Sequence, residues 1–184
     1  MSRSHTSPRA GFSIPEVMTA MFILVIGLVT FLAMFGNAVS TMQYSQEDLI
    51  CKQKAKETME NIYTARENTQ ITFANIQNDT VTGGVFKSGL QPLTVAGPDG
   101  LVGTADDGAV ETMTFPGPDG ILGTADDMIV PLNNFKRQIL ITPLLQSNSV
   151  ANPSIRQLSV TIQYTNARGE IRSYELDSLI SFYR

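Results

Sequence analysis

The chain has 184 residues, of which 42% are hydrophobic and only 16% are charged, and its formal net charge is −4. The acidic balance and the lack of a Lys/Arg-rich run argue against a nucleic-acid partner, because neutralising phosphates requires a clustered basic face. Its one cysteine excludes an intramolecular disulfide, and its one histidine, His5, lies too near the N-terminus to favour imidazole-based catalysis.

Residues 17–36 predict a membrane-spanning helix. Sixteen of these 20 residues are apolar, and at about 1.5 Å per residue they span roughly 30 Å, the thickness of a bilayer's hydrocarbon core. In residues 12–46 the only charged residue is Glu16, whereas Arg3 and Arg9 precede the segment. The positive-inside rule therefore places the N-terminus in the cytoplasm and the residues after about 40 on the far side of the membrane.

A short motif, Gly11-Phe12-Ser13-Ile14-Pro15-Glu16-Val17, stands between a basic leader and this apolar helix. An ordinary secretory signal has a shorter apolar region followed by a small-residue cleavage site, which is not evident here. The motif and its position resemble the class III signal of type IV prepilins and type II secretion pseudopilins. The resemblance implies cleavage by a prepilin peptidase between Gly11 and Phe12, with residues 1–11 as the leader, and N-methylation of Phe12.

Glu16 has two interpretations. An ionisable residue at the head of a spanning helix costs roughly 2.5 to 3.5 kcal/mol at the bilayer centre, which favours a functional role. The pilin resemblance implies that its carboxylate attracts the N-terminal ammonium of a neighbouring subunit, so that the pairing offsets the burial of both charges in a filament. Alternatively, a Glu in the first turn after Pro15 merely starts the helix and meets the positive end of its dipole.

Residues 37–66 continue the helix without Gly or Pro, which predicts one long helix from 12 to 66, with 12–36 in the membrane or filament core and 37–66 amphipathic. The predicted apolar side comprises Met42, Leu49, Ala55, Met59, Ile62 and Tyr63. Cys51 is interpreted as a small helix residue without chemistry, because no context that stabilises a thiolate is identifiable.

Residues 67–184 predict a β-rich globular head. Short strands are expected at 81–86 and 110–115, and clearer ones at 135–143, 155–165 and 171–183. Leu158, Val160, Ile162 and Tyr164 alternate with polar residues, as in a half-buried strand, and Asn166-Ala167-Arg168-Gly169 predicts a hairpin turn. The expected fold class is α+β, with the long helix packed on an antiparallel sheet, and the pilin resemblance implies the same architecture.

An acidic repeat interrupts the head. Residues 97–107 (GPDGLVGTADD) return as residues 117–127 (GPDGILGTADD), with nine of eleven positions identical, and no basic residue lies between Lys87 and Lys136. Glycine-rich turns with carboxylates suit Ca²⁺, which binds six to eight oxygens. The candidate ligands are Asp99, Asp106, Asp107, Asp119, Asp126 and Asp127. The spacing does not match an EF-hand, and the alternative is a pair of Pro-Asp-Gly turns with solvated acids.

The expected function is structural. Pro15 before the Glu, and Ala33 where major pilins often have Pro, make the sequence look most like minor pilins of the PilV type. The resemblance implies other pilin subunits, prepilin peptidase, an inner-membrane assembly platform and lipid as partners, first in the bacterial inner membrane and then in a pilus. The alternatives are a type II secretion pseudopilin and, in another class, a signal-anchored ligand-binding domain that does not assemble. An enzyme is not expected, because the cleaved chain has no histidine.

Overall fold

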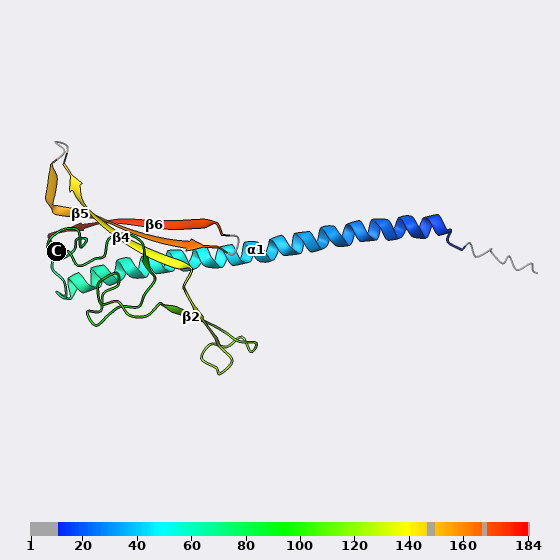
Figure 1. The fold of residues 1–184 in the computed structure, drawn as a ribbon, viewed down its shortest axis with the longest axis horizontal. Coiled ribbons are helices and arrows are strands. Elements are labelled where there is room, and N and C mark those ends of the chain that lie inside the picture. Colours follow the sequence, from blue (N-terminus) through cyan, green and yellow to red (C-terminus); the bar gives the residue numbers. More distant parts are fainter. Residues whose placement is uncertain (1–10, 147–149, 167–168, 184) are drawn as a thin grey trace, which may run out of the picture. The chain divides into compact units, whose positions relative to one another are not determined.

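The structure, a computed structural model, describes residues 11–146, 150–166 and 169–183. The chain divides into two compact units, residues 1–45 and 46–184. One helix, α1 (Ile14–Glu67), runs through both units, and antiparallel strands follow it (Figure 1). The strands in the described residues are β1 (Gln91–Pro92), β2 (Thr112–Phe115), β3 (Met128–Pro131), β4 (Phe135–Leu145), β5 (Ala151–Thr165) and β6 (Ile171–Ser181). The predicted α+β class is confirmed.

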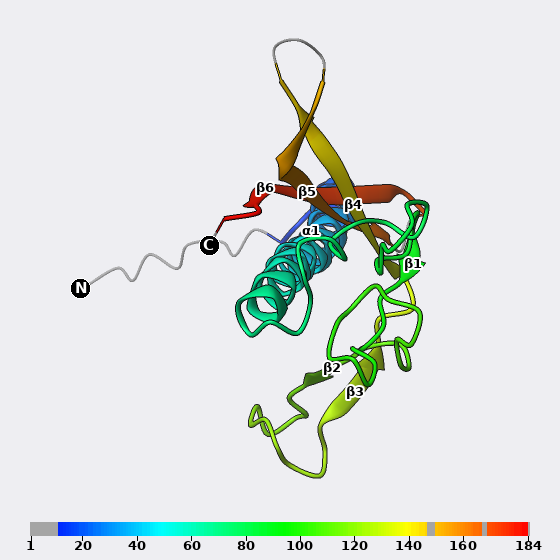
Figure 2. The ribbon, with the colours of Figure 1, turned by 90° about the vertical axis from the view of Figure 1, so that its left-hand side faces the viewer.

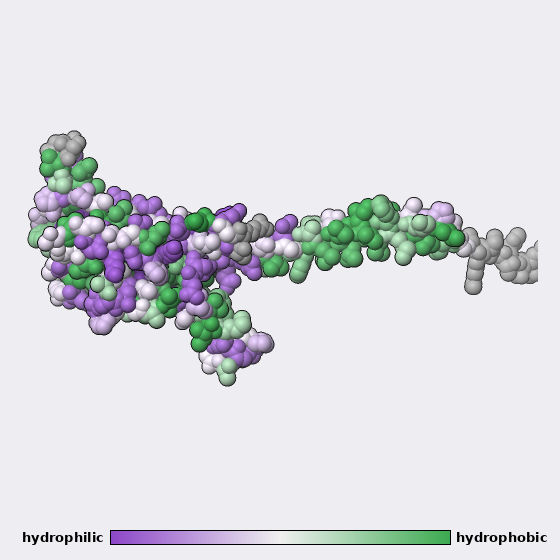
Figure 3. Space-filling model, viewed as in Figure 1, coloured by the Kyte–Doolittle hydropathy of each residue, from purple (hydrophilic) through white to green (hydrophobic). Residues whose placement is uncertain are grey.

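The first part of α1 exposes its apolar side chains. Phe22, Ile23 and Leu24 are each about two-thirds exposed, and Figure 3 shows a continuous hydrophobic surface over this segment. Its hydroxyl groups turn back to the helix: Thr30 Oγ1 donates to the Ile26 carbonyl at 2.8 Å, so a polar side chain in hydrocarbon keeps a partner. The helix is long and apolar enough to cross a membrane.

The last part of α1 belongs to the head unit and buries one face in its core. The buried residues recur every three or four positions, as one face of a helix requires: Ile50, Cys51, Ala55, Thr58, Met59, Ile62 and Ala65. The predictions for Leu49 and Met42 are wrong, since these side chains are 64% and 74% exposed. Leu49 and Met42 precede Ala55 by six and thirteen residues, so at about 100° per residue both lie roughly 120–140° around the helix from that buried position.

The main sheet has the order β1-β4-β5-β6, and Figure 2 shows its strands passing over one side of α1. The predicted alternation in β5 is confirmed, because Leu158, Val160, Ile162 and Tyr164 are all buried. The predicted hairpin is also confirmed, since β5 and β6 pair from Thr165 opposite Ile171 onward; residues 167 and 168 of its turn lie outside the described residues. Helix and sheet share one hydrophobic core.

Other strand predictions need correction. Residues 81–86 form turns, with only a single bridge between Asn78 and Phe86, because the chain folds back at Gly84, where a Cβ atom would lie 2.1 Å from the Asn78 carbonyl oxygen. The expected strand at 110–115 begins at Thr112 and pairs with β3, which was not predicted. The short β1 was not predicted either. The β2–β3 hairpin carries the second repeat in its connecting loop.

Candidate functional site

The two residues at the expected processing site lie in open surroundings. Phe12 is 82% exposed, and a Cβ atom added to Gly11 would meet nothing within 4 Å. Local packing therefore gives no reason for glycine at position 11. This distinguishes Gly11 from Gly97 and Gly117, where a Cβ atom would lie 2.2 Å and 2.3 Å from atoms of Asp106 and Asp126.

Glu16 contacts the start of its own helix. Its Oε2 accepts a long hydrogen bond of 3.5 Å from the backbone N–H of Ser13, while the Ser13 carbonyl accepts the backbone N–H groups of Glu16 and Val17. Ser13 is the residue before the first helical position, so Ser13 and Glu16 form one half of a capping box. The Ser-x-x-Glu spacing in the sequence is the signal that predicts such a contact. The contact corresponds to the interpretation of Glu16 as a helix start.

In the first repeat, residues 97–107, the aspartates bind donors of their own loop, and Asp107 also accepts the Thr94 hydroxyl at 2.6 Å. Asp99 Oδ1 accepts the Leu101 N–H at 2.8 Å, and Asp106 accepts the Thr104 hydroxyl at 2.7 Å and the Asp99 N–H at 3.1 Å. Asp107 accepts the N–H groups of Gly103 and Thr104 at 2.9 Å and 3.0 Å. The Thr104 hydroxyl in particular lowers the pKa of Asp106.

The second repeat, residues 117–127, folds in nearly the same way. Asp119 Oδ1 accepts the Ile121 N–H at 2.8 Å, Asp126 accepts the Thr124 hydroxyl at 2.6 Å, and Asp127 accepts the N–H of the glycine at 123 at 2.6 Å. The Thr124 hydroxyl lowers the pKa of Asp126, as in the first copy. Near-identical sequences thus give the same loop twice, because its hydrogen bonds are local.

The two copies differ in what surrounds them. Leu101 of the first repeat is 2% exposed, whereas Ile121 at the same position of the second is 60% exposed. Asp107 also contacts Arg137 of β4, at 3.5 Å. Asp127 has no such base in the described residues, and its Oδ1 is buried without a hydrogen-bond partner there. The first copy is part of the head core, and the second is a surface loop.

The calcium prediction gains no support from this geometry and stays a prediction. Several of the expected ligand oxygens accept hydrogen bonds from backbone N–H groups and threonine hydroxyls, and these donors compete with a cation for them. Among the residues that the structure describes, no group of three or more His, Cys, Asp or Glu side chains could hold a metal ion. The like charges are instead stabilised by hydrogen bonds.

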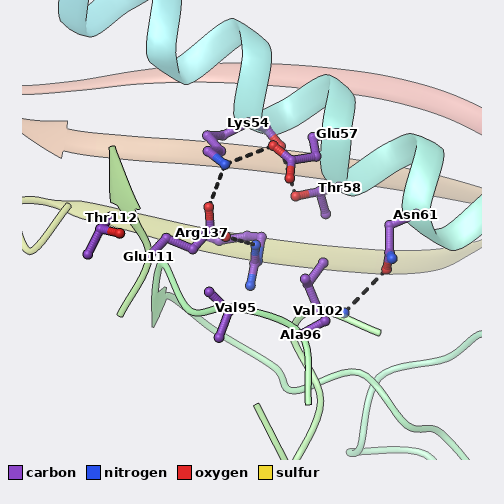
Figure 4. A pocket seen from close by; sticks show the side chains of 10 residues that line it. All are labelled: Lys54, Glu57, Thr58, Asn61, Val95, Ala96, Val102, Glu111, Thr112 and Arg137. Carbon is purple, nitrogen blue, oxygen red and sulfur yellow. Dashed lines mark hydrogen bonds and ion pairs between the residues drawn. The ribbon is translucent and has the colours of Figure 1, made fainter. Parts of the chain in front are cut away.

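Beside the first repeat lies a cavity of about 330 Å³, which both charged and apolar side chains line (Figure 4). Lys54 of α1 contacts Glu111 at 2.6 Å and Glu57 at 2.8 Å. Arg137, which is 3% exposed, contacts Glu111 at 3.4 Å and Asp107 at 3.5 Å. Burial alone would lower the pKa of Lys54, but the two carboxylates that bind it outweigh burial and raise it. The ion pairs of this cluster connect α1, β4 and the first repeat.

This ion cluster was not predicted. Positions 54, 111 and 137 are far apart in the chain, and only the folded head brings them together, so no local sequence signal could have found them. The acids and bases of the cluster bind one another as ion pairs. Cys51 does not line the cavity and is fully buried. Burial raises the pKa of its thiol to about 12, which keeps it protonated and unreactive at neutral pH.

Comparison of the chain with protein-family models, curated proteins and solved structures finds no match.

Proposed function

We propose that the chain is a membrane-anchored structural subunit with an extracytoplasmic head. One observation carries the proposal: α1 is a single helix, Ile14–Glu67, that is apolar and exposed in its first part and supplies one face of the head core in its last. The same helix therefore serves as membrane segment and as core element. A signal sequence that is cleaved off does not continue into a helix that forms part of the core of the folded head.

More specifically, the subunit is a minor type IV pilin. A prepilin peptidase cleaves between Gly11 and Phe12 and methylates Phe12, and the carboxylate of Glu16 pairs with the N-terminal ammonium of a neighbouring subunit. The open surroundings of Gly11 support this, because packing does not explain a glycine there. The partners are other pilin subunits, the peptidase and an inner-membrane assembly platform. The head lies in the periplasm before it enters the pilus.

A type II secretion pseudopilin fits the same features. The alternative of another class, an anchored ligand-binding domain that never assembles, is favoured by the contact between Glu16 and the Ser13 N–H, which gives Glu16 a role in the isolated chain. We do not propose an enzyme, since the acids and bases at the cavity beside the first repeat are ion-paired.

Mass spectrometry of the N-terminus from the native host tests the processing step. A mature chain that begins with N-methylated Phe12 is expected. A retained leader would refute processing and would favour the alternative, an anchored ligand-binding domain that does not assemble. Replacing Gly11 with a bulky residue is expected to leave the precursor uncleaved in the membrane.

Two substitutions at Glu16 separate assembly from capping. Glu16→Gln keeps an oxygen that can accept the Ser13 N–H, as glutamine does in capping boxes, but it removes the charge. Glu16→Ala removes both. If the charge pairs with a neighbouring subunit, both variants insert into the membrane and both fail to enter filaments. Normal incorporation of Glu16→Gln, with loss only in Glu16→Ala, would show that Glu16 acts as a cap.

A further inference from the structure

The first repeat shows how this loop is held by a protein surface. The Asn61 side-chain amide donates to the Gly100 carbonyl at 2.9 Å, and its oxygen accepts the Val102 N–H at 3.3 Å. The Gln70 amide donates to the carbonyl of Asp99. One carboxamide thus binds two backbone groups on the tip of the loop.

Apolar and charged groups complete this receptor face, which we define as Asn61, Gln70, Phe86, Arg137 and Ile139. Ile139 comes so close to the loop that a Cβ atom at position 103 would lie 2.6 Å from its Cδ1. The side chain of Leu101 is buried in the core, and Arg137 binds Asp107. The receptor face therefore combines an apolar hollow, a carboxamide and a guanidinium.

The same groups of the second repeat are not covered by any residue that the structure describes. Ile121 and Leu122, which correspond to the docked residues 101 and 102, are 60% and 62% exposed. Cβ atoms added to Gly120 or Gly123 would meet nothing within 4 Å, although these glycines share the positive φ of their counterparts. The loop is shaped for close approach by a surface that the described part of the chain does not supply. Figure 1 shows the β2–β3 hairpin that bears it extending from the sheet and helix.

We propose that the second repeat is a docking element for another protein, whose surface presents an apolar hollow flanked by a carboxamide and an arginine. The first repeat specifies this chemistry, and charge agrees with it, because the loop carries Asp119, Asp126 and Asp127 and no base. A second copy of this chain is the wrong partner, since its receptor face is already filled by its own first repeat. A symmetrical contact between two second repeats would bring like charges together. The proposal does not depend on filament assembly.

Site-specific photocrosslinking in the full chain, in cells of the native host, tests the proposal. A benzoylphenylalanine replaces Leu122, and in a parallel chain it replaces Val102. The probe at position 102 is expected to crosslink within the chain to α1 near Asn61. The probe at position 122 is expected to give one adduct with a different protein. An arginine and an asparagine or glutamine are expected in the crosslinked peptide of that protein or beside it in its structure.

Two variants control this experiment. Ile121→Asp is expected to reduce the adduct at least about tenfold, as loss of a buried anchor does, whereas Leu179→Asp, an equally exposed leucine on β6, leaves it unchanged. The absence of an adduct, an adduct with lipid or with a second copy, a partner site without a basic residue, or an adduct that survives Ile121→Asp would each overturn the proposal.

Discussion

The matched positions 101 and 121 allow a direct test of the difference between the two repeats. Leu101→Ala removes a side chain that is 2% exposed, and Ile121→Ala one that is 60% exposed. Replacing a buried leucine with alanine generally lowers the free energy of unfolding by about 2–5 kcal/mol. Leu101 borders an open cavity of about 430 Å³, so its neighbours can relax, and we expect about 2–3 kcal/mol at the lower end of that range.

The exposed position is expected to change the free energy of unfolding by less than about 0.5 kcal/mol. For a chain of this size, the loss of about 2–3 kcal/mol expected for Leu101→Ala corresponds to a fall in melting temperature of about 4–12 °C. The assay is far-UV circular dichroism of the detergent-solubilised full chain during thermal and urea unfolding, because the chain has no tryptophan. Equal losses at both positions would refute the reasoning, since they would mean that the second repeat is also packed within the chain.

Three further predictions concern the charged groups of the head. Arg137→Met is expected to cost about 3–5 kcal/mol of stability, because it leaves buried carboxylates, including Glu111, with fewer partners; a loss below 1 kcal/mol in urea unfolding would contradict this. Hydrogen bonds lower the pKa of Asp106 and Asp126 below the ordinary value of 3.8, so their contribution to stability is complete above that value and disappears as the pH falls through the lowered pKa values; a melting temperature unchanged down to pH 2 would count against it. If the repeats bind calcium, millimolar calcium raises the melting temperature, and no shift would favour plain turns.

Periodic features of the sequence were sufficient to predict the helix and the main hairpin. The apolar run and the absence of Gly and Pro after Gly36 gave a helix to about residue 66, and α1 ends at Glu67. The alternation from Leu158 to Tyr164 identified β5 and its buried face. These signals are local, because each reflects one face of one element turned toward a core.

What could not be predicted depends on contacts between distant residues. The repeats share nine of eleven residues, yet within the described residues only the first is docked, because Asn61 and Ile139 lie opposite it in the folded head. The ion pairs of Arg137 likewise join residues that are 26 and 30 positions apart. A pattern within one segment carries no information about which other segment it will meet.

The hydrogen bonds that shape the second repeat join groups within its own eleven residues, whereas the first repeat is also bound by Asn61, Gln70 and Arg137. In the second repeat, these internal hydrogen bonds hold the conformation of the loop without contacts from the surrounding structure. It can therefore be copied into a hairpin turn at the small entropic cost of a longer loop, which grows only slowly with length. The head gains a new surface by duplication while its core stays untouched, and further changes of residues 121 and 122 could retune that surface without disturbing the fold.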